Sequence, residues 1–196
     1  MIRILKTAAA AILLSTPVLA DAVTYAPDPG HTEVRFYWNH AGVSEQSGEW
    51  GKVTGEVSLD PENIPAATVS LQVDPASLFT GVEALDKHMK SPDMFDIEKH
   101  GTITFVSTSV EQTGDKTAKI TGDLTIKGIT KPLVLDVELV HIGEHPVGQY
   151  IDYYKGQWLG VKATGTLIRS EFGVGYAAPL TSDEIRLEIL AELKAK

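Results

Sequence analysis

The sequence contains no cysteine and few basic residues. Because none of its 196 residues is a cysteine, disulfide bonds, thiol redox chemistry and cysteine–zinc sites are excluded, and the fold must be held by its core. Lysine and arginine together number 17, against 26 aspartate and glutamate residues, and the formal net charge is −9. Phosphates of nucleic acids and anionic lipid head groups are repelled by such a surface. We therefore expect no nucleic-acid partner.

The sequence also lacks an apolar run long enough to cross a bilayer as a helix, which needs about 18 to 20 such residues. Residues 1–20 combine a short basic start, an apolar run from Ala8 to Leu14 and the small-residue site Val18-Leu19-Ala20. This order is typical of a secretory signal peptide that is removed after Ala20, with cleavage after Ala22 as the nearby alternative. We expect an exported, periplasmic protein with one domain at 21–196 and no membrane span.

From Glu33 onward apolar and polar residues alternate, which is the period of antiparallel strands with one buried face. Turns rich in glycine, proline and Asp/Asn divide this part of the chain into about eight strands. Short connections favour a closed up-and-down barrel over a two-sheet sandwich, since closure removes the edge strands. The predicted fold is thus all-β, an antiparallel lipocalin-like barrel. Its strands are expected near residues 33–40, 52–59, 68–74, 102–110, 120–126, 133–139, 158–169 and 184–193.

One stretch, DKHMKSPDMFDIEKHG from Asp86 to Gly101, interrupts the strand pattern. Thr80-Gly81-Val82-Glu83 fits a capping box that starts a helix, and Ser91-Pro92 ends it. The sequence therefore predicts a short helical segment after the third strand, with an apolar stripe against the sheet. The residues of that stripe are Val82, Leu85 and Met89.

Acids and histidines in the same stretch raise the question of a metal or catalytic centre. Imidazole and carboxylate suit zinc or manganese, but Asp86 and His88 are two apart and point to different faces of a helix. We therefore favour structural roles as helix pairs and caps, while acid–base work by this pair stays open. His141 and His145 lie at a strand end and in a loop, and we interpret them as a solvated pair. No serine has a nucleophile motif around it, so neither a catalytic residue nor a metal site is predicted.

Four segments in order resemble the YceI family of exported, lipocalin-like polyisoprenoid-binding proteins: DPGHTEVRFYWNHAGVSEQSGEW, LDKHMKSPDMFDIEKHGTITFVST, ITGDLTIKGITKPLVLDVEL and GTLIRSEFG. The resemblance implies an extended barrel around an apolar tunnel for an isoprenoid or similar lipid tail, partly covered by the helix. The family's Asp-x-His-Leu motif falls on Asp86 to Met89, and its Gly-x-Leu-Thr hairpin falls on Gly122 to Pro132. The sequence departs from the family at Leu85, where arginine is frequent, and at Met89, where leucine is frequent. A segment around HPVGQYIDYYKGQW is also longer and more aromatic than usual.

An eight-stranded barrel is either just filled by its side chains or holds one small ligand, and composition leaves both outcomes open. Arg169 continues the inward parity of its strand, and a buried guanidinium needs a partner, either a barrel acid such as Asp86 or a ligand head group. Asp86, His88 and Arg169 are therefore the expected polar mouth. The expected tunnel lining consists of Phe36, Trp38, Leu71, Val73, Met89, Phe95, Phe105, Leu124, Leu135, Val161 and Leu187.

The predicted function is an exported, non-enzymatic binding protein that encloses a polyisoprenoid or other amphiphilic lipid for transport or storage. Two rivals stay open. One is an enzyme acting on a lipid-like substrate through Asp86, His88 and Arg169, and the other is a filled barrel acting through protein partners in the envelope. No cofactor is expected beyond a bound isoprenoid lipid or quinone-like molecule, and a homodimer is left open.

Overall fold

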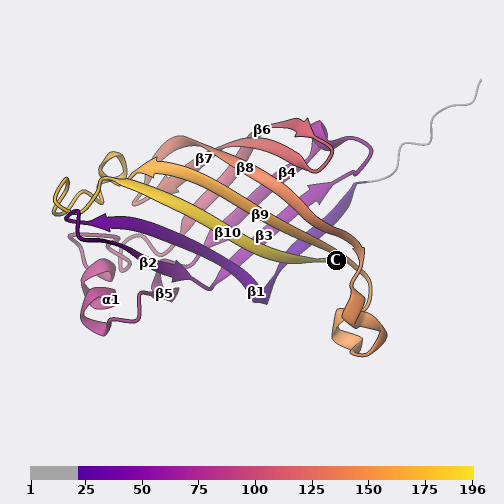
Figure 1. Cartoon of the computed structure of the whole chain (residues 1–196), viewed down its shortest axis with the longest axis horizontal. Coiled ribbons are helices and arrows are strands. Elements are labelled where there is room, and N and C mark those ends of the chain that lie inside the picture. Colours follow the sequence, from indigo (N-terminus) through magenta and orange to yellow (C-terminus); the bar gives the residue numbers. More distant parts are fainter. Residues whose placement is uncertain (1–21) are drawn as a thin grey trace, which may run out of the picture.

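The first and last strands, β1 (Val23–His40) and β10 (Glu184–Ala195), are hydrogen-bonded to each other and close a sheet of ten antiparallel strands into a barrel (Figure 1). The structure is a computed structural model that describes residues 22–196. The predicted signal peptide lies outside the described residues. No helix within 22–196 is long and apolar enough to cross a membrane.

The remaining strands follow one another around the barrel. Their bounds are β2 (Ser44–Trp50), β3 (Val53–Leu59), β4 (Thr68–Val73), β5 (Leu78–Phe79), β6 (Ile103–Gly114), β7 (Thr117–Ile126), β8 (Ile129–Glu144) and β9 (Gln157–Ile168). The closed circuit is β1, β3, β4, β6, β7, β8, β9 and β10, while β2 and β5 extend it at one end. The predicted eight-stranded barrel is therefore confirmed. Single 3-10 turns connect some strands: η1 (Ile64–Ala66), η2 (Pro75–Ser77), η3 (Pro146–Gln149), η4 (Asp152–Tyr154) and η5 (Arg169–Phe172).

The start of β1 and the strands β2 and β5 were not predicted from the sequence. β1 begins at Val23, whereas the sequence predicted a start at Glu33. The early part was missed because the register of β1 shifts between Pro27 and Thr32, and the prolines and glycine of this bulge resemble a turn in the sequence. β2 was missed because its sequence, SEQSGEW, is polar and does not alternate. It pairs with the second half of β1, and β3 pairs with the first few residues. β2 and β3 therefore pair with two different parts of the same long, bent strand β1.

Two glycines allow chain segments to come close inside the sheet. Gly55 has a φ of 124°, and a Cβ there would lie 2.1 Å from the Ser70 carbonyl oxygen. Gly122 faces inward, and a Cβ there would lie 2.4 Å from Cζ of Phe105. The missing side chain therefore makes room for the Phe105 ring on the inner face of the sheet.

The single α-helix of residues 22–196, α1 (Glu83–Lys90), lies at one end of the barrel (Figure 1). Its predicted capping box is wrong, because the N-cap residue is Val82 and no side chain caps the helix. Thr80 instead donates its hydroxyl and its backbone N–H to Asp86 Oδ1, at 2.6 and 2.8 Å. Val82 is 55% exposed, whereas Leu85 and Met89 face the barrel interior. The apolar stripe is thus narrower than predicted.

Different segments cover the two ends of the barrel (Figure 1). At the α1 end, residues 169–183 connect β9 to β10, and Thr181 bridges to His40 of β1. At the opposite end, the β8–β9 connection contains η3 and η4 and lies beside the C-terminus. The two connections thus lie at opposite ends of the barrel. Their positions give the barrel two chemically different ends.

Candidate functional site

The barrel interior contains an apolar cavity of about 640 Å³. This volume lies within the range of small-molecule sites, roughly 300 to 1,000 Å³. The cavity contradicts the filled barrel that the composition had left open. Every residue of the predicted lining borders it: Phe36, Trp38, Leu71, Val73, Met89, Phe95, Phe105, Leu124, Leu135, Val161 and Leu187. That these side chains contact a ligand remains a prediction.

Alternation along the strands explains why the predicted lining lies around one space. Successive side chains of a strand point to opposite faces, so residues two apart share the inner face of a closed barrel. Phe36 and Trp38 of β1 show this, with ring centroids 5.7 Å apart. A β-bulge within a strand could have changed which of its side chains face the interior. The register shifts in β1, β6 and β8 fall outside the predicted lining residues.

The α1 helix and the segment after it form a cover over part of the cavity. Met89, Met94 and Phe95 are buried and line the cavity from this side. Phe95 packs edge-on against Trp50, with ring centroids 5.4 Å apart, and Trp50 packs against Phe36 at 4.4 Å. The stretch that interrupts the strand pattern therefore contributes apolar side chains to the cavity wall.

The polar side chains that border the cavity gather at its α1 end. His40, Gln46, His88, Tyr176 and Thr181 border this end, and Thr32 is near the opposite end. The rings of His88 and Tyr176 meet edge-on with centroids 4.9 Å apart. An amphiphile in this cavity would therefore find polar partners at the α1 end. Arg169 also borders the cavity, and of all these polar residues only His88 and Arg169 had been predicted from the sequence.

Arg169 is buried at the α1 end, as predicted, but its partners are not those expected. Its guanidinium donates to the backbone carbonyls of Ser182, Val174, Tyr176 and Thr181, and to the Thr181 hydroxyl. Burial lowers the pKa of Arg169, and the charge of Asp183 opposes this change. Because its donors are occupied by the 174–182 segment, Arg169 is an anchor for that segment. The predicted pairing with Asp86 is wrong.

Asp86 does not belong to the cavity. It accepts two hydrogen bonds from Thr80 and is absent from the cavity lining. Two residues of the predicted polar mouth, His88 and Arg169, border the cavity. Of these two, only His88 has a side chain without a hydrogen bond to another residue of the described chain. The proposed catalytic cluster of Asp86, His88 and Arg169 therefore does not converge.

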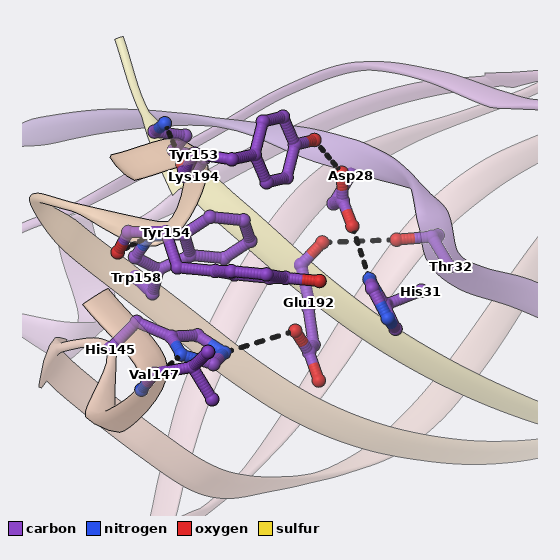
Figure 2. A network of polar contacts seen from close by, with 10 residues as sticks. All are labelled: Asp28, His31, Thr32, His145, Val147, Tyr153, Tyr154, Trp158, Glu192 and Lys194. Carbon is purple, nitrogen blue, oxygen red and sulfur yellow. Dashed lines mark hydrogen bonds and ion pairs between the residues drawn. The ribbon is translucent and has the colours of Figure 1, made fainter. Parts of the chain in front are cut away.

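A second polar cluster lies at the opposite end of the barrel (Figure 2). It was not predicted from the sequence, although Asp28 and His31 lie in the first segment that resembles the family. Asp28 and His31 come from the bulge of β1, and Glu192 comes from β10. Asp28 is 3% exposed. Burial alone would raise the pKa of its carboxyl, but hydrogen bonds from Tyr153 and His31 outweigh burial and lower it. The cluster joins residues more than 120 positions apart, which explains why it escaped sequence inspection.

The β8–β9 connection is packed onto this end through its aromatic side chains (Figure 2). Tyr154 and His145 lie with ring centroids 4.6 Å apart, and Trp158 donates its indole N–H to the Tyr154 carbonyl at 3.0 Å. Lys194 lies over the ring of Tyr153 at 4.9 Å. The prediction of a solvated His145 is wrong, because its side chain is only 16% exposed and its Nε2 lies 3.4 Å from Glu192 Oε2.

The chain belongs to the YceI-like domain family, whose model matches residues 25–193. A UPF0312 protein of Vibrio cholerae is 36% identical over 89% of each chain. Among solved structures, BcnA of Burkholderia cenocepacia has a TM-score of 0.73 at 21% identity and covers 85% of this chain and 98% of that one. A polyisoprenoid binding domain from Saccharophagus degradans has a TM-score of 0.62 at 9% identity, over 89% and 99% of the two chains. Both structures share the fold of this chain.

Proposed function

We propose that the protein is an exported carrier that encloses a polyisoprenoid or similar amphiphilic lipid in its barrel, for transport or storage. The observation that supports this proposal is the apolar cavity of about 640 Å³ in the centre of the molecule. Empty apolar space costs stability, because the lining side chains lose packing contacts. A chain that needed only a stable barrel would fill this space with side chains.

The burial of a hydrocarbon tail supplies a sufficient driving force. Each CH₂ removed from water is worth about 0.8 kcal/mol, so even a partly enclosed prenyl tail supplies free energy for well beyond micromolar affinity before the entropic cost of binding is subtracted. The tail would occupy the space between Phe105 of β6 and Leu187 of β10, and the head group would lie near His88. The Saccharophagus degradans protein of the same fold is a polyisoprenoid binding domain, which is consistent with this class of ligand.

The proposal assigns binding and no chemical step. Among residues 22–196, the polar groups near the expected head-group position are hydroxyl, amide and imidazole groups and the guanidinium of Arg169, whose donors are occupied. Export follows from residues 1–20, whose composition is typical of a signal peptide. The resulting location is the periplasm.

The test is lipid uptake by the mature chain, purified without detergent and measured by native mass spectrometry. We expect an adduct from the host cell or, after incubation with a prenyl lipid, one bound lipid per chain. Phe105→Asp places a carboxylate inside the cavity and should abolish uptake. The matched control is Val106→Asp, because Val106 is the next residue of the same strand and 48% exposed. Equal uptake by both folded variants, or no uptake by the unmodified chain, would disprove the proposal.

A further inference from the structure

The cluster at the end opposite α1 contains two carboxylates that no lysine or arginine of the described chain neutralises. Asp28 is almost completely buried, and its only ion-pair partner among residues 22–196 is His31. Glu192 has only His145 as its partner in the same range. A buried carboxylate normally has a positive charge close by or takes up a proton. Asp28 is buried and the Glu192 side chain is 40% exposed, and the closeness of these two carboxylates points to a cation site.

The ligand atoms are already close enough to surround one ion. One ligand atom each from Asp28, His31 and Glu192 lies within 4.8 Å of the other two. Asp28 Oδ2 and His31 Nδ1 are 2.5 Å apart, so the proton that they share must leave when a metal binds both atoms. Metal ions replace such a proton when they bind imidazole and carboxylate.

Hydrogen bonds outside the cluster orient the ligands (Figure 2). The Tyr153 hydroxyl donates to Asp28 Oδ1, which leaves Oδ2 facing His31. The backbone N–H of Val147 donates to His145 Nδ1 at 3.1 Å, so a neutral His145 carries its proton on Nε2, toward Glu192. His145 therefore supports Glu192 as a donor and is not itself a ligand. Metal sites commonly have such supporting partners.

From this geometry we propose that Asp28, His31 and Glu192 bind a divalent transition-metal ion of the zinc class. One imidazole and two carboxylates suit zinc or manganese. The ion joins the β1 bulge to β10, and the ligand supports from Tyr153 and His145 tie the β8–β9 connection to the same point. Its role is structural. It holds the barrel end where Pro27 and Thr32 border the cavity.

This site differs from the metal question raised by the sequence. Among residues 22–196, the histidines and acids of the α1 region do not form a group that could hold an ion, whereas Asp28, His31 and Glu192 do. The site is also independent of the lipid cavity, because its ligands are not cavity-lining residues. Failure of lipid uptake would therefore not disprove it.

The test uses the mature chain, treated with EDTA and titrated with zinc chloride at neutral pH. We expect one zinc ion per chain by isothermal titration calorimetry and by elemental analysis after gel filtration. Bound metal should raise the melting temperature by several degrees, because it binds only the folded chain. Cobalt in the same site should give a visible spectrum that reports oxygen and nitrogen ligands.

Two ligand variants and two controls decide the assignment. His31→Gln and Glu192→Gln should each weaken zinc binding at least about tenfold. The controls are His100→Gln and Glu184→Gln, where Glu184 is an exposed acid at the other end of β10. They should bind zinc like the unmodified chain. Folding of each variant is checked by circular dichroism, and zinc-induced shifts of the His31 ring signals in the unmodified chain give a readout that needs no variant.

Three outcomes would overturn the assignment: no zinc uptake at millimolar concentration, uptake that neither ligand variant weakens, or zinc-induced shifts confined to other histidines.

Discussion

The ring of Tyr176 meets the ring of His88 edge-on, with their centroids 4.9 Å apart. Tyr176 belongs to the segment between β9 and β10, and His88 belongs to α1. Both border the cavity. This contact therefore joins the two covers of the α1 end at the wall of the cavity.

The Tyr176→Ala variant should open this end of the barrel. Removing the ring breaks the contact between the two covers, and aromatic pairs of this kind contribute about 0.5 to 1.5 kcal/mol. If the proposed carrier function is correct, release of a fluorescent prenyl lipid should become several-fold faster, with little change in the melting temperature. Stopped-flow transfer to acceptor vesicles measures the rate. The control is Tyr150→Ala, since Tyr150 is 80% exposed on the β8–β9 connection, and an equal effect there would contradict the prediction.

Much of the barrel could be predicted from the sequence because local alternation fixes which side chains face inward. Phe36 and Trp38, or Leu71 and Val73, lie two apart on one strand, and the closed barrel turns that shared face into a shared cavity wall. The number of strands in the circuit followed from the same signal. The size of the cavity did not, because it depends on how far the inner side chains reach across the barrel.

The polar contacts could not be predicted, because they join distant residues or use partners that the residue pattern does not specify. Asp28 meets Tyr153 across 125 positions, and Arg169 finds its partners in carbonyl groups that carry no residue-type signal. The capping box failed for a related reason, since Asp86 takes the Thr80 hydroxyl that was expected to cap the helix. In each case, the local residue pattern does not specify the partner.

Arg169→Lys should destabilise the protein markedly. The guanidinium satisfies the carbonyls of Ser182, Tyr176 and Thr181 together, and an ammonium group cannot reach all of them from the same position. Buried carbonyls without a donor are costly, so we expect a loss of at least about 2 kcal/mol in the free energy of unfolding. Urea unfolding followed by tryptophan fluorescence measures it. Arg35→Lys, at an exposed ion pair with Glu33, should stay close to the unmodified chain.

Asp183 should make the 169–183 segment sensitive to acid. Its carboxylate accepts hydrogen bonds from the hydroxyl and the backbone N–H of Ser170, at 2.6 and 2.8 Å. The pKa of Asp183 lies below its ordinary value of 3.8, mainly because the Ser170 hydroxyl donates a hydrogen bond to the carboxylate. The Ser170 backbone N–H and the charge of Arg169 also lower this pKa, whereas burial opposes the change. A lowered pKa means that the stabilisation is complete above the ordinary value and is lost as the pH falls through the folded-state value.

The Asp183→Asn variant should therefore be less stable than the unmodified chain at neutral pH and nearly equal to it at strongly acidic pH. Unfolding curves at several pH values measure the difference, and the carboxyl signal of Asp183 by NMR should titrate below 3.8. Asp115→Asn, in an exposed turn, is the control. A constant difference between Asp183→Asn and the unmodified chain at all pH values would show that the carboxylate charge is not involved.

Gly122→Ala should disturb the cavity from its wall. The added Cβ would lie 2.4 Å from Cζ of Phe105 and 2.7 Å from the Val106 carbonyl oxygen, so the ring must move into the cavity and the strand must shift. Overpacking of this kind costs about 1 to 3 kcal/mol. The double variant with Phe105→Leu should recover part of the loss, because it removes the ring while the backbone contact remains. Gly51→Ala provides the matched control, since no atom of the described chain lies within 4 Å of a Cβ at that position. Thermal unfolding of Gly122→Ala, Phe105→Leu, the double variant and Gly51→Ala measures the coupling. A Gly122→Ala variant as stable as Gly51→Ala would show that Phe105 does not lie over Gly122.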